Sequence, residues 1–549
     1  MIEMYVGKNN SPETILSNDI SATATTIPLA SIAGLPPAPN LCTIGEGDDA
    51  EVVRYNSISG QSLTGCERGF GGTTAKLWIK GEVVARCYTE YDHEAFIANI
   101  RELQADVKRY GVKFAGSVSK GVRLYDAAGL NAAVGTDEED AENDFDTIMP
   151  WAGMRRCNTA IIGGERVPTY FEGEVGYSNT EADVFVYVPR FYYWRSEDDS
   201  EHVVSMSPLK GYRVPSKFKR ADGTLRDYVF LAAYTLGMNG DVPVSRSGYY
   251  AHGTSLNAFM NTICKGQHTA ETLDSDIWIE GMKDDEIKCI LLDIEFATRD
   301  HQTVMYGAAN MRYASDVATG GGTNQVMLDA ANAVKYAIGQ TIAVGTTDKG
   351  SEVMARGTVT EINAETGVIT FEPDGEDVTV SVGNYVSSRP WKSGACDSVK
   401  SSSGSPVSNA SGVYPCVWRG MENPWGNAFH WKYDFLKNDD QGYVLDAPEN
   451  YSASIGAHHT ALSYKTAKTN GYATKMGFDE NFPFARVTEE VGGGSTTYFA
   501  DYFYYSAGVR ALLVGGGVGD ARHAGARYCR VGSAPSSSSW SYCAALSPA

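Results

Sequence analysis

The side chains best suited to contact a ligand gather in the last stretch of the chain, from Ala511 to Ser547. This C-terminal segment is rich in Gly and Ser and follows neither a helical nor a strand period. It nonetheless carries bulky and basic residues: Arg522, His523, Arg527, Tyr528, Arg530, Trp540 and Tyr542. A frayed chain end usually lacks such aromatics, whereas many binding sites consist of loops that carry contact side chains on a rigid base. The segment therefore predicts non-covalent recognition of a ligand.

Other clusters give weaker indications of chemistry. His458 and His459 are adjacent but have no further ligands at zinc spacing, and the ten cysteines form no CxxC pattern. Gly320 to Gly322 lacks a following Lys-Ser/Thr, which predicts a flexible loop and not a phosphate cradle. One loop is rich in oxygen ligands: Asn438, Asp439, Asp440 and Gly442. Without a glutamate at EF-hand spacing an ordinary polar turn is favoured there. We expect no metal or cofactor, and calcium stays as the alternative.

The composition indicates a β- and loop-rich protein of several domains. The chain has 549 residues, 58 of them Gly and 32 Tyr, and 21% are charged, which predicts roughly two to four domains. A net charge of −21 argues against nucleic acid or an anionic membrane as the main partner. No apolar run approaches the roughly 18 residues that span a bilayer. Met1 to Lys8 lacks the apolar core of a signal peptide, which favours synthesis in a reducing cytoplasm with mostly free, buried cysteines.

The elements that would position the C-terminal segment divide the chain into four parts. Residues 1–90 alternate short strand-like runs with turn clusters, which is typical of a small β domain. Residues 91–112 include a helix. A larger domain is expected over 113–338 and 389–549, with a helix at 284–298, and it is interrupted at 339–388 by a small module of alternating strands. The turn of one hairpin in that module is predicted around Glu365 to Gly367. The expected fold class is α+β and β-rich.

The first helix is predicted from Asp92 to Tyr110. Its apolar residues recur at steps of four and three: Phe96, Ile100, Leu103, Val107 and Tyr110. This spacing forms an a/d seam, with Asp92 as the N-cap and Gly111 just past the end. The helix lies between two β-rich regions, which favours a short coiled coil between subunits. An amphipathic helix that packs on its own domain is the alternative.

One internal motif carries a resemblance to a known family. The sequence NPWGNAFHW, from Asn423 to Trp431, resembles a signature of the C-type-lectin-like fold in its formylglycine-generating-enzyme-like branch. The sequence ALLVGG, from Ala511 to Gly516, followed by an irregular stretch, resembles the variable region of diversity-generating retroelement proteins. In that family a reverse transcriptase rewrites adenine-rich codons at the end of a ligand-binding protein. Segments such as TGCERGFGGTTAKLW are similar to phage tail proteins, so the resemblance extends over most of the chain.

The resemblance divides the residues around the C-terminal segment into frame and replaceable contacts. The frame that it implies is Leu512, Leu513, Gly515, Gly516, Ala524, Gly525, Trp540, Trp425, Gly426, Asn427 and Trp431. The diversified, ligand-binding positions that it implies are Gly517, Gly519, Asp520, Arg522, His523, Tyr528, Cys529, Arg530, Gly532, Ser533, Ser537, Ser539 and Ser541. All these residue types are reachable from an AAY codon by changes at adenine. The chain departs from the pattern at Val518, where relatives have Trp, and at Cys543 to Leu546, where they have GAR-L.

The function that the resemblance implies is a phage tail-tip receptor-binding protein. It would be a trimer in the virion, assembled in the bacterial cytoplasm, with a host-cell protein or glycan and the tail or baseplate proteins as partners. A bacterial surface adhesin of lectin type is the nearer alternative. An oxidase of the formylglycine-generating type is the more distant one, and it requires Cys529 and Cys543 to lie close together or to bind copper. A catalytic thiol also needs an electropositive, partly exposed niche, so binding is favoured over catalysis and no catalytic residue is assigned.

Overall fold

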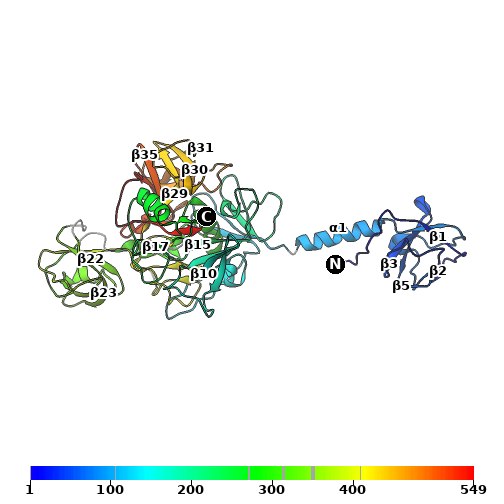
Figure 1. Cartoon of the computed structure of the whole chain (residues 1–549), viewed down its shortest axis with the longest axis horizontal. Helices are drawn as coiled ribbons and strands as arrows, with labels where there is room; N and C mark the ends of the chain where they lie inside the picture. Colours follow the sequence, from blue (N-terminus) through cyan, green and yellow to red (C-terminus); the bar gives the residue numbers. More distant parts are fainter. Residues whose placement is uncertain are drawn as a thin grey trace. The chain divides into compact units, whose positions relative to one another are not determined.

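The computed structural model describes residues 2–105, 107–269, 273–311, 316–347, 353–408 and 410–548. The chain forms two compact units, Met1–Val107 and Lys108–Ala549, which are taken in turn (Figure 1). The protein is β-rich, with 37% of its residues in strands and 14% in helices, which confirms the expected β-rich class. Its sheets are curled.

The first unit is a small β structure. A sheet in the order β1-β7-β3-β4 packs with a second sheet in the order β2-β6-β5 around Leu63, Val53 and Trp78. The buried Glu51 carboxylate accepts hydrogen bonds from Arg68 and from the Trp78 indole, each at 2.7 Å, so the charge inside this core is satisfied. The strands are β1 (Thr14–Ile15), β2 (Thr26–Pro28), β3 (Asn40–Ile44), β4 (Glu51–Tyr55), β5 (Ser57–Ser59), β6 (Ser62–Thr64) and β7 (Val83–Ala85).

Helix α1 (Glu90–Ala105) follows the sheets. Thr89 and Asp92 exchange side-chain to backbone hydrogen bonds at its start, at 3.0 and 3.3 Å. Thr89 is therefore the N-cap and Asp92 the third helical residue, so the prediction of Asp92 as the cap was wrong. The predicted end was also wrong, because residues 110–113 form strand β8 (Tyr110–Lys113), where hydrogen bonds to β14 (Glu201–Ser205) replace helical ones.

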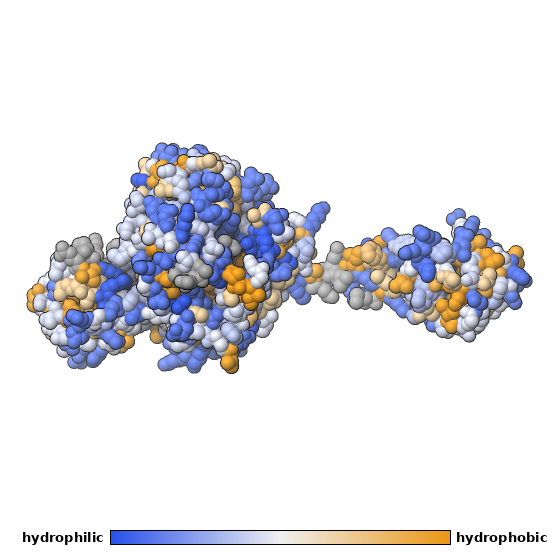
Figure 2. Space-filling model, in the orientation of Figure 1, coloured by the Kyte–Doolittle hydropathy of each residue, from blue (hydrophilic) through white to orange (hydrophobic). Residues whose placement is uncertain are grey.

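One side of α1 packs on its own unit. Asn99 bonds to the main chain of Ile2 at 2.5 and 2.8 Å, and the Tyr91 ring lies 4.7 Å from that of Phe70. The predicted seam lies elsewhere on the helix, since Phe96 is 51% exposed. Ile100 is also exposed, and Figure 2 shows apolar atoms along this helix.

The second unit is built around helix α2 (Met282–Phe296), which confirms the helix predicted at 284–298 with an earlier start. Its first turn is capped by Asp284, which accepts from Gly281 at 2.9 Å, and by Asp434, which accepts from Met282. The apolar residues of α2 pack against two four-stranded sheets in the orders β11-β10-β12-β15 and β13-β14-β8-β9. The strands are β9 (Val122–Tyr125), β10 (Arg155–Ile162), β11 (Glu165–Phe171), β12 (Phe185–Pro189), β13 (Tyr192–Arg195), β14 (Glu201–Ser205) and β15 (Tyr228–Ala232).

A nine-stranded curled sheet contains the C-terminal segment. Its order is β31-β30-β29-β35-β36-β34-β32-β33, and β37 pairs in parallel with β29. Figure 1 shows β29, β30, β31 and β35 side by side. The strands are β29 (Phe429–Asn438), β30 (Gln441–Leu445), β31 (His459–Lys465), β32 (Gly471–Met476), β33 (Thr488–Gly493), β34 (Tyr502–Tyr505), β35 (Val509–Gly515), β36 (Gly525–Ser533) and β37 (Tyr542–Cys543).

Short strands complete this unit and tie distant segments together. The last strand pairs with residues 277–279, next to the start of α2. The strands are β16 (Gly237–Asn239), β17 (Val242–Val244), β18 (Ile277–Ile279), β26 (Ser403–Gly404), β27 (Val417–Trp418), β28 (Met421–Glu422) and β38 (Leu546–Pro548).

The inserted module is larger than the predicted 339–388. Its seven-stranded sheet has the order β19-β25-β22-β23-β24-β21-β20 and begins at Asp316. Gly320 to Gly322, expected to be a loop, is strand β20, because β21 supplies backbone partners that the glycine sequence does not reveal. The hairpin turn at Glu365 to Gly367 is confirmed between β23 and β24. The elements are β19 (Asp316–Val317), β20 (Gly320–Gly322), β21 (Gln325–Met327), α3 (Ala330–Ala333), β22 (Thr341–Gly345), β23 (Val353–Asn363), β24 (Val368–Pro373) and β25 (Tyr385–Ser388).

Candidate ligand-binding surface

The Trp425-Gly426-Asn427 motif is buried and joins β29 to neighbouring loops. The Trp425 indole donates to the carbonyl of Met305 at 3.1 Å. Gly426 has a φ of +86°, and a Cβ at this position would lie 3.1 Å from that of Ala309. The backbone conformation and the close approach both favour glycine here.

Two further residues of the motif tie down other segments. The Asn427 side chain accepts from the backbone of Trp391 at 2.9 Å. The Trp431 indole, on β29, donates to the carbonyl of Thr254 at 3.0 Å. The motif thus fixes the loops around the central strands.

The Gly515-Gly516 turn carries the chain from β35 toward β36. Both glycines have positive φ, +87° and +77°, and a Cβ on Gly516 would lie 2.8 Å from that of Ala524. A Cβ on Gly525 would collide with the Asp501 carboxylate. The small residues at these positions allow the close approach of the two strands.

Successive residues of β35 and β36 face two different apolar clusters, one on each side of the sheet. Leu513 and Tyr528 belong to one apolar cluster, while Leu512 and Cys529 belong to the cluster on the other side of the sheet. Side chains alternate between the faces of a strand, so neighbours in the sequence separate. Tyr528 and Cys529 are 2% and 3% exposed, and their expected role as ligand contacts is therefore wrong for this conformation.

The remaining positions that were predicted to be diversified also differ in exposure. Three more are buried: Gly517, Ser533 and Ser541. Eight are at least partly exposed: Gly519, Asp520, Arg522, His523, Arg530, Gly532, Ser537 and Ser539. The buried ones have internal partners, as with the Ser533 hydroxyl, which donates to that of Tyr542 at 3.2 Å. A ligand can therefore reach these eight exposed residues among the predicted contacts.

Half-buried aromatic rings lie beside these exposed positions. The His523 ring stacks on that of Tyr502 at 4.1 Å and 24°, and the Tyr472 ring lies 5.5 Å from His523. The Arg530 guanidinium lies over the Tyr504 ring at 4.3 Å. Because Arg530 pairs with Tyr504 across neighbouring strands, these residues are contiguous. We call Tyr472, Tyr502, Tyr504, His523 and Arg530 the aromatic surface.

Three tyrosines of this surface were missed by the sequence analysis. Tyr472, Tyr502 and Tyr504 precede the C-terminal segment and reach it only through the pairing of β32, β34 and β36. The run YFYY at 502–505, in which only Phe503 is buried, was the available signal. It indicates a strand with one tyrosine-rich face.

The turn before β36 is held by ionic contacts. Arg522 pairs with Asp300 at 2.5 Å and donates to the carbonyl of Ser495 at 2.8 Å. The Asp520 carboxylate accepts from the backbone of Gly517 at 2.7 Å, and burial raises the pKa of Asp520 to about 6. Burial lowers the pKa of His523, which favours its neutral, stacking form.

A buried charge cluster supports β36 from the α2 side. Arg527 forms a two-pronged ion pair with Asp293 of α2, at 2.9 and 2.6 Å. His202 and His301 lie 3.0 and 3.3 Å from the same carboxylate. This geometry fixes β36 to the helix.

The two cysteines of the oxidase alternative are not brought together. Cys543 pairs with His430, which pairs with Val514, which pairs with Cys529. Three strand spacings separate the cysteines, or about 14 Å. All ten cysteines are free, and burial raises the pKa of the Cys529 and Cys543 thiols to about 12.

The oxygen-rich loop proposed for calcium is engaged with protein groups. Asp440 pairs with Lys468 at 3.0 Å, and Asp439 accepts from the backbone of Gly508 at 2.9 Å. His458 pairs with Asp446 at 2.9 Å. Within the described ranges no group of three or more His, Cys, Asp or Glu residues could hold a metal ion.

Comparison with known proteins adds no relative. No protein-family model matches the chain, and no curated protein matches it significantly.

In the part of the chain that the structure describes, no helix is long and apolar enough to cross a membrane.

Proposed function

We propose that this chain is a phage tail-tip receptor-binding protein whose aromatic surface binds a ligand on the host cell. The observation that carries the proposal is the stacking of His523 and Arg530, from the C-terminal segment, on tyrosines of the neighbouring strand. Tyr and Arg are the residues that dominate binding energy at interfaces. Tyrosine loses little conformational entropy on binding, and here the neighbouring rings already restrict it.

The proposed domain is of the C-type-lectin-like type. The buried Trp425-Gly426-Asn427 motif and the paired glycines at 515–516 support this, since they build a frame that leaves the surface positions free to vary. Under this proposal a retroelement rewrites the eight exposed positions.

The proposed assembly is a trimer held partly by α1, with residues 1–90 attached to the tail. The exposed Phe96 and Ile100 support an intersubunit contact, because burial of two such side chains is favourable. Several copies would turn weak single contacts into avidity.

The alternatives use the same fold differently. A bacterial surface adhesin would use the same aromatic surface, so it is distinguished by where the protein is displayed. An oxidase of the formylglycine-generating type is disfavoured by the strand spacing between Cys529 and Cys543 and by their buried, protonated thiols.

Binding of the labelled full-length protein to a panel of bacterial strains tests the proposal. We expect saturable binding to a subset of strains and a loss of about tenfold or more for Tyr502→Ala, a half-buried anchor. Tyr170→Ala, at an exposed tyrosine on β11, is the matched control. Equal binding by both variants would contradict the assigned surface, and immunogold labelling of virions and cells separates the tail protein from the adhesin.

The diversification proposal has a genetic test. We expect the neighbouring DNA to contain a near-copy of the last ~40 codons, a length longer than an ordinary loop. The differences should fall at adenines of the near-copy. Absence of the near-copy and of a reverse transcriptase gene would indicate fixed specificity.

A further inference from the structure

A pocket of about 460 Å³ lies at the edge of the β11-β10-β12-β15 sheet, away from the aromatic surface. Its volume is within the range of small-ligand sites. The walls come from the β10–β11 turn, the loop that leads into β15 and the end of the chain at Pro548. None of the diversified positions lines it.

Two of its cations are fixed by the protein. The Lys217 ammonium is nearly buried and contacts the Asp284 carboxylate and the Ser547 hydroxyl, each at 2.5 Å. Arg166 pairs with Asp276 at 2.7 Å and with Asp274 at 2.6 Å. Lys217 and Arg166 therefore line the pocket while their charges are paired with groups of the protein.

Arg220 is held less firmly. Its guanidinium pairs with Glu165 at 3.0 Å, and the two side chains are 31% and 64% exposed. An exposed ion pair contributes little stability, and solvent competes for both partners. An incoming anion would therefore exchange with Glu165 at small cost.

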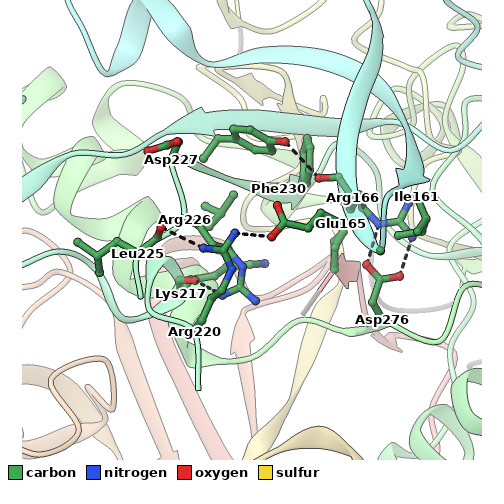
Figure 3. Close-up of a pocket in the computed structure, with 14 residues that line it drawn as sticks. Ile161, Glu165, Arg166, Lys217, Arg220, Leu225, Arg226, Asp227, Phe230 and Asp276 are labelled. Atoms are coloured by element: carbon green, nitrogen blue, oxygen red, sulfur yellow. Dashed lines mark hydrogen bonds and ion pairs between the residues drawn. The ribbon is translucent and has the colours of Figure 1, made fainter. Parts of the chain in front are cut away.

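A second guanidinium lies close by. Arg226 donates to the carbonyls of Lys217 and Lys219 at 3.2 and 3.4 Å. Burial, with added repulsion from Arg220, lowers the pKa of Arg226. Figure 3 shows Glu165, Arg220 and Arg226 directed toward one another in the pocket. An anion between the two arginines would relieve their repulsion.

We propose that this pocket binds the carboxylate or phosphate group of a small ligand, which displaces Glu165 and pairs with Arg220 and Arg226. The ring of Tyr228, which also lines the pocket, provides an apolar face beside the anion. The proposal is independent of the aromatic surface and of the phage assignment.

Calorimetric titration of the full chain with galacturonate, inorganic phosphate and neutral galactose tests it. We expect one or both anions to bind, weakening as salt is added, and galactose to bind far more weakly. The anion that binds more tightly shows whether the site prefers a carboxylate or a phosphate, and binding of either one supports the proposal.

Three variants make the test specific. Arg220→Gln should weaken anion binding about tenfold or more, since a charge-assisted pair is lost, whereas Glu165→Gln should tighten it by removal of the competing carboxylate. Arg54→Gln has the same charge change at another exposed pair, with Glu67 in the first unit, and should bind as the parent does. Failure of both the parent and Glu165→Gln to bind either anion, or equal losses in Arg220→Gln and Arg54→Gln, would overturn the proposal.

Discussion

At the scale of single residues, the predicted frame is largely explained by geometry. Gly515, Gly516 and Gly525 stand where a Cβ is strained or collides. The family resemblance implied their role as frame, and the physical reason is that glycine in a tight approach has few substitutes. The burial of Tyr528 and Cys529 could not be predicted, because distant segments form an apolar cluster on each face of β36, and the aperiodic local sequence does not show this.

Asp520 provides a test of the turn before β36. Burial raises the pKa of Asp520 from 3.8, its ordinary value, to about 6 in the folded protein. Above pH 3.8 the ionised carboxylate therefore disfavours the folded state. Asp520→Asn keeps an acceptor for Gly517 and should stabilise the protein by roughly 1–3 kcal/mol at pH 7.5, with little effect at pH 4. Thermal unfolding at both pH values measures this.

The control for that measurement is Asp222→Asn. Asp222 is exposed, and hydrogen bonds from Thr224 lower its pKa, so no gain is expected. A loss of stability in Asp520→Asn at pH 7.5 would contradict the account of the turn.

At the scale of elements, the attachment of β36 to α2 rests on Arg527 and Asp293. Arg527→Met leaves a buried carboxylate without its cation, which should cost about 3–5 kcal/mol. Lys475→Met breaks an exposed pair with Glu489 on the same curled sheet and should cost less than about 1 kcal/mol. Urea unfolding measures the free energy of unfolding of both variants. Similar losses would show that the buried ion pair does not hold β36 to α2.

Helix α1 carries the oligomerisation prediction. Phe96→Ser together with Ile100→Ser should convert the proposed trimer into monomers, because the exposed apolar seam is removed. Leu77→Ser, at a still more exposed apolar residue of the same unit, should leave the mass unchanged in light scattering. A parent protein that is already a monomer would contradict the trimer.

Element boundaries were predicted less well than element types. The helix near 92 was found from the spacing of its apolar residues, and the helix at 284–298 from its length and capping residues. The start of the inserted module was missed because its first strand, β19, pairs with distant β25, and the three glycines of β20 resemble a loop. Long-range partners of this kind leave no local signal.

At the scale of the whole molecule, we propose that a rigid frame is separate from a replaceable surface. The separation predicts that specificity and stability respond to different residues of one short segment. Exchange of the exposed diversified positions should redirect binding without unfolding the domain, while changes at the buried ones should act on stability.

The most direct test is the strain-binding profile of full-length variants in which the eight exposed positions are exchanged together. We expect folded proteins, with a cooperative unfolding transition, that bind a different set of strains. As the matched comparison, substitution at Tyr528 and Cys529 should lower the melting temperature. Exchanged variants that keep the parental strain profile would contradict the claim that the C-terminal surface selects the ligand.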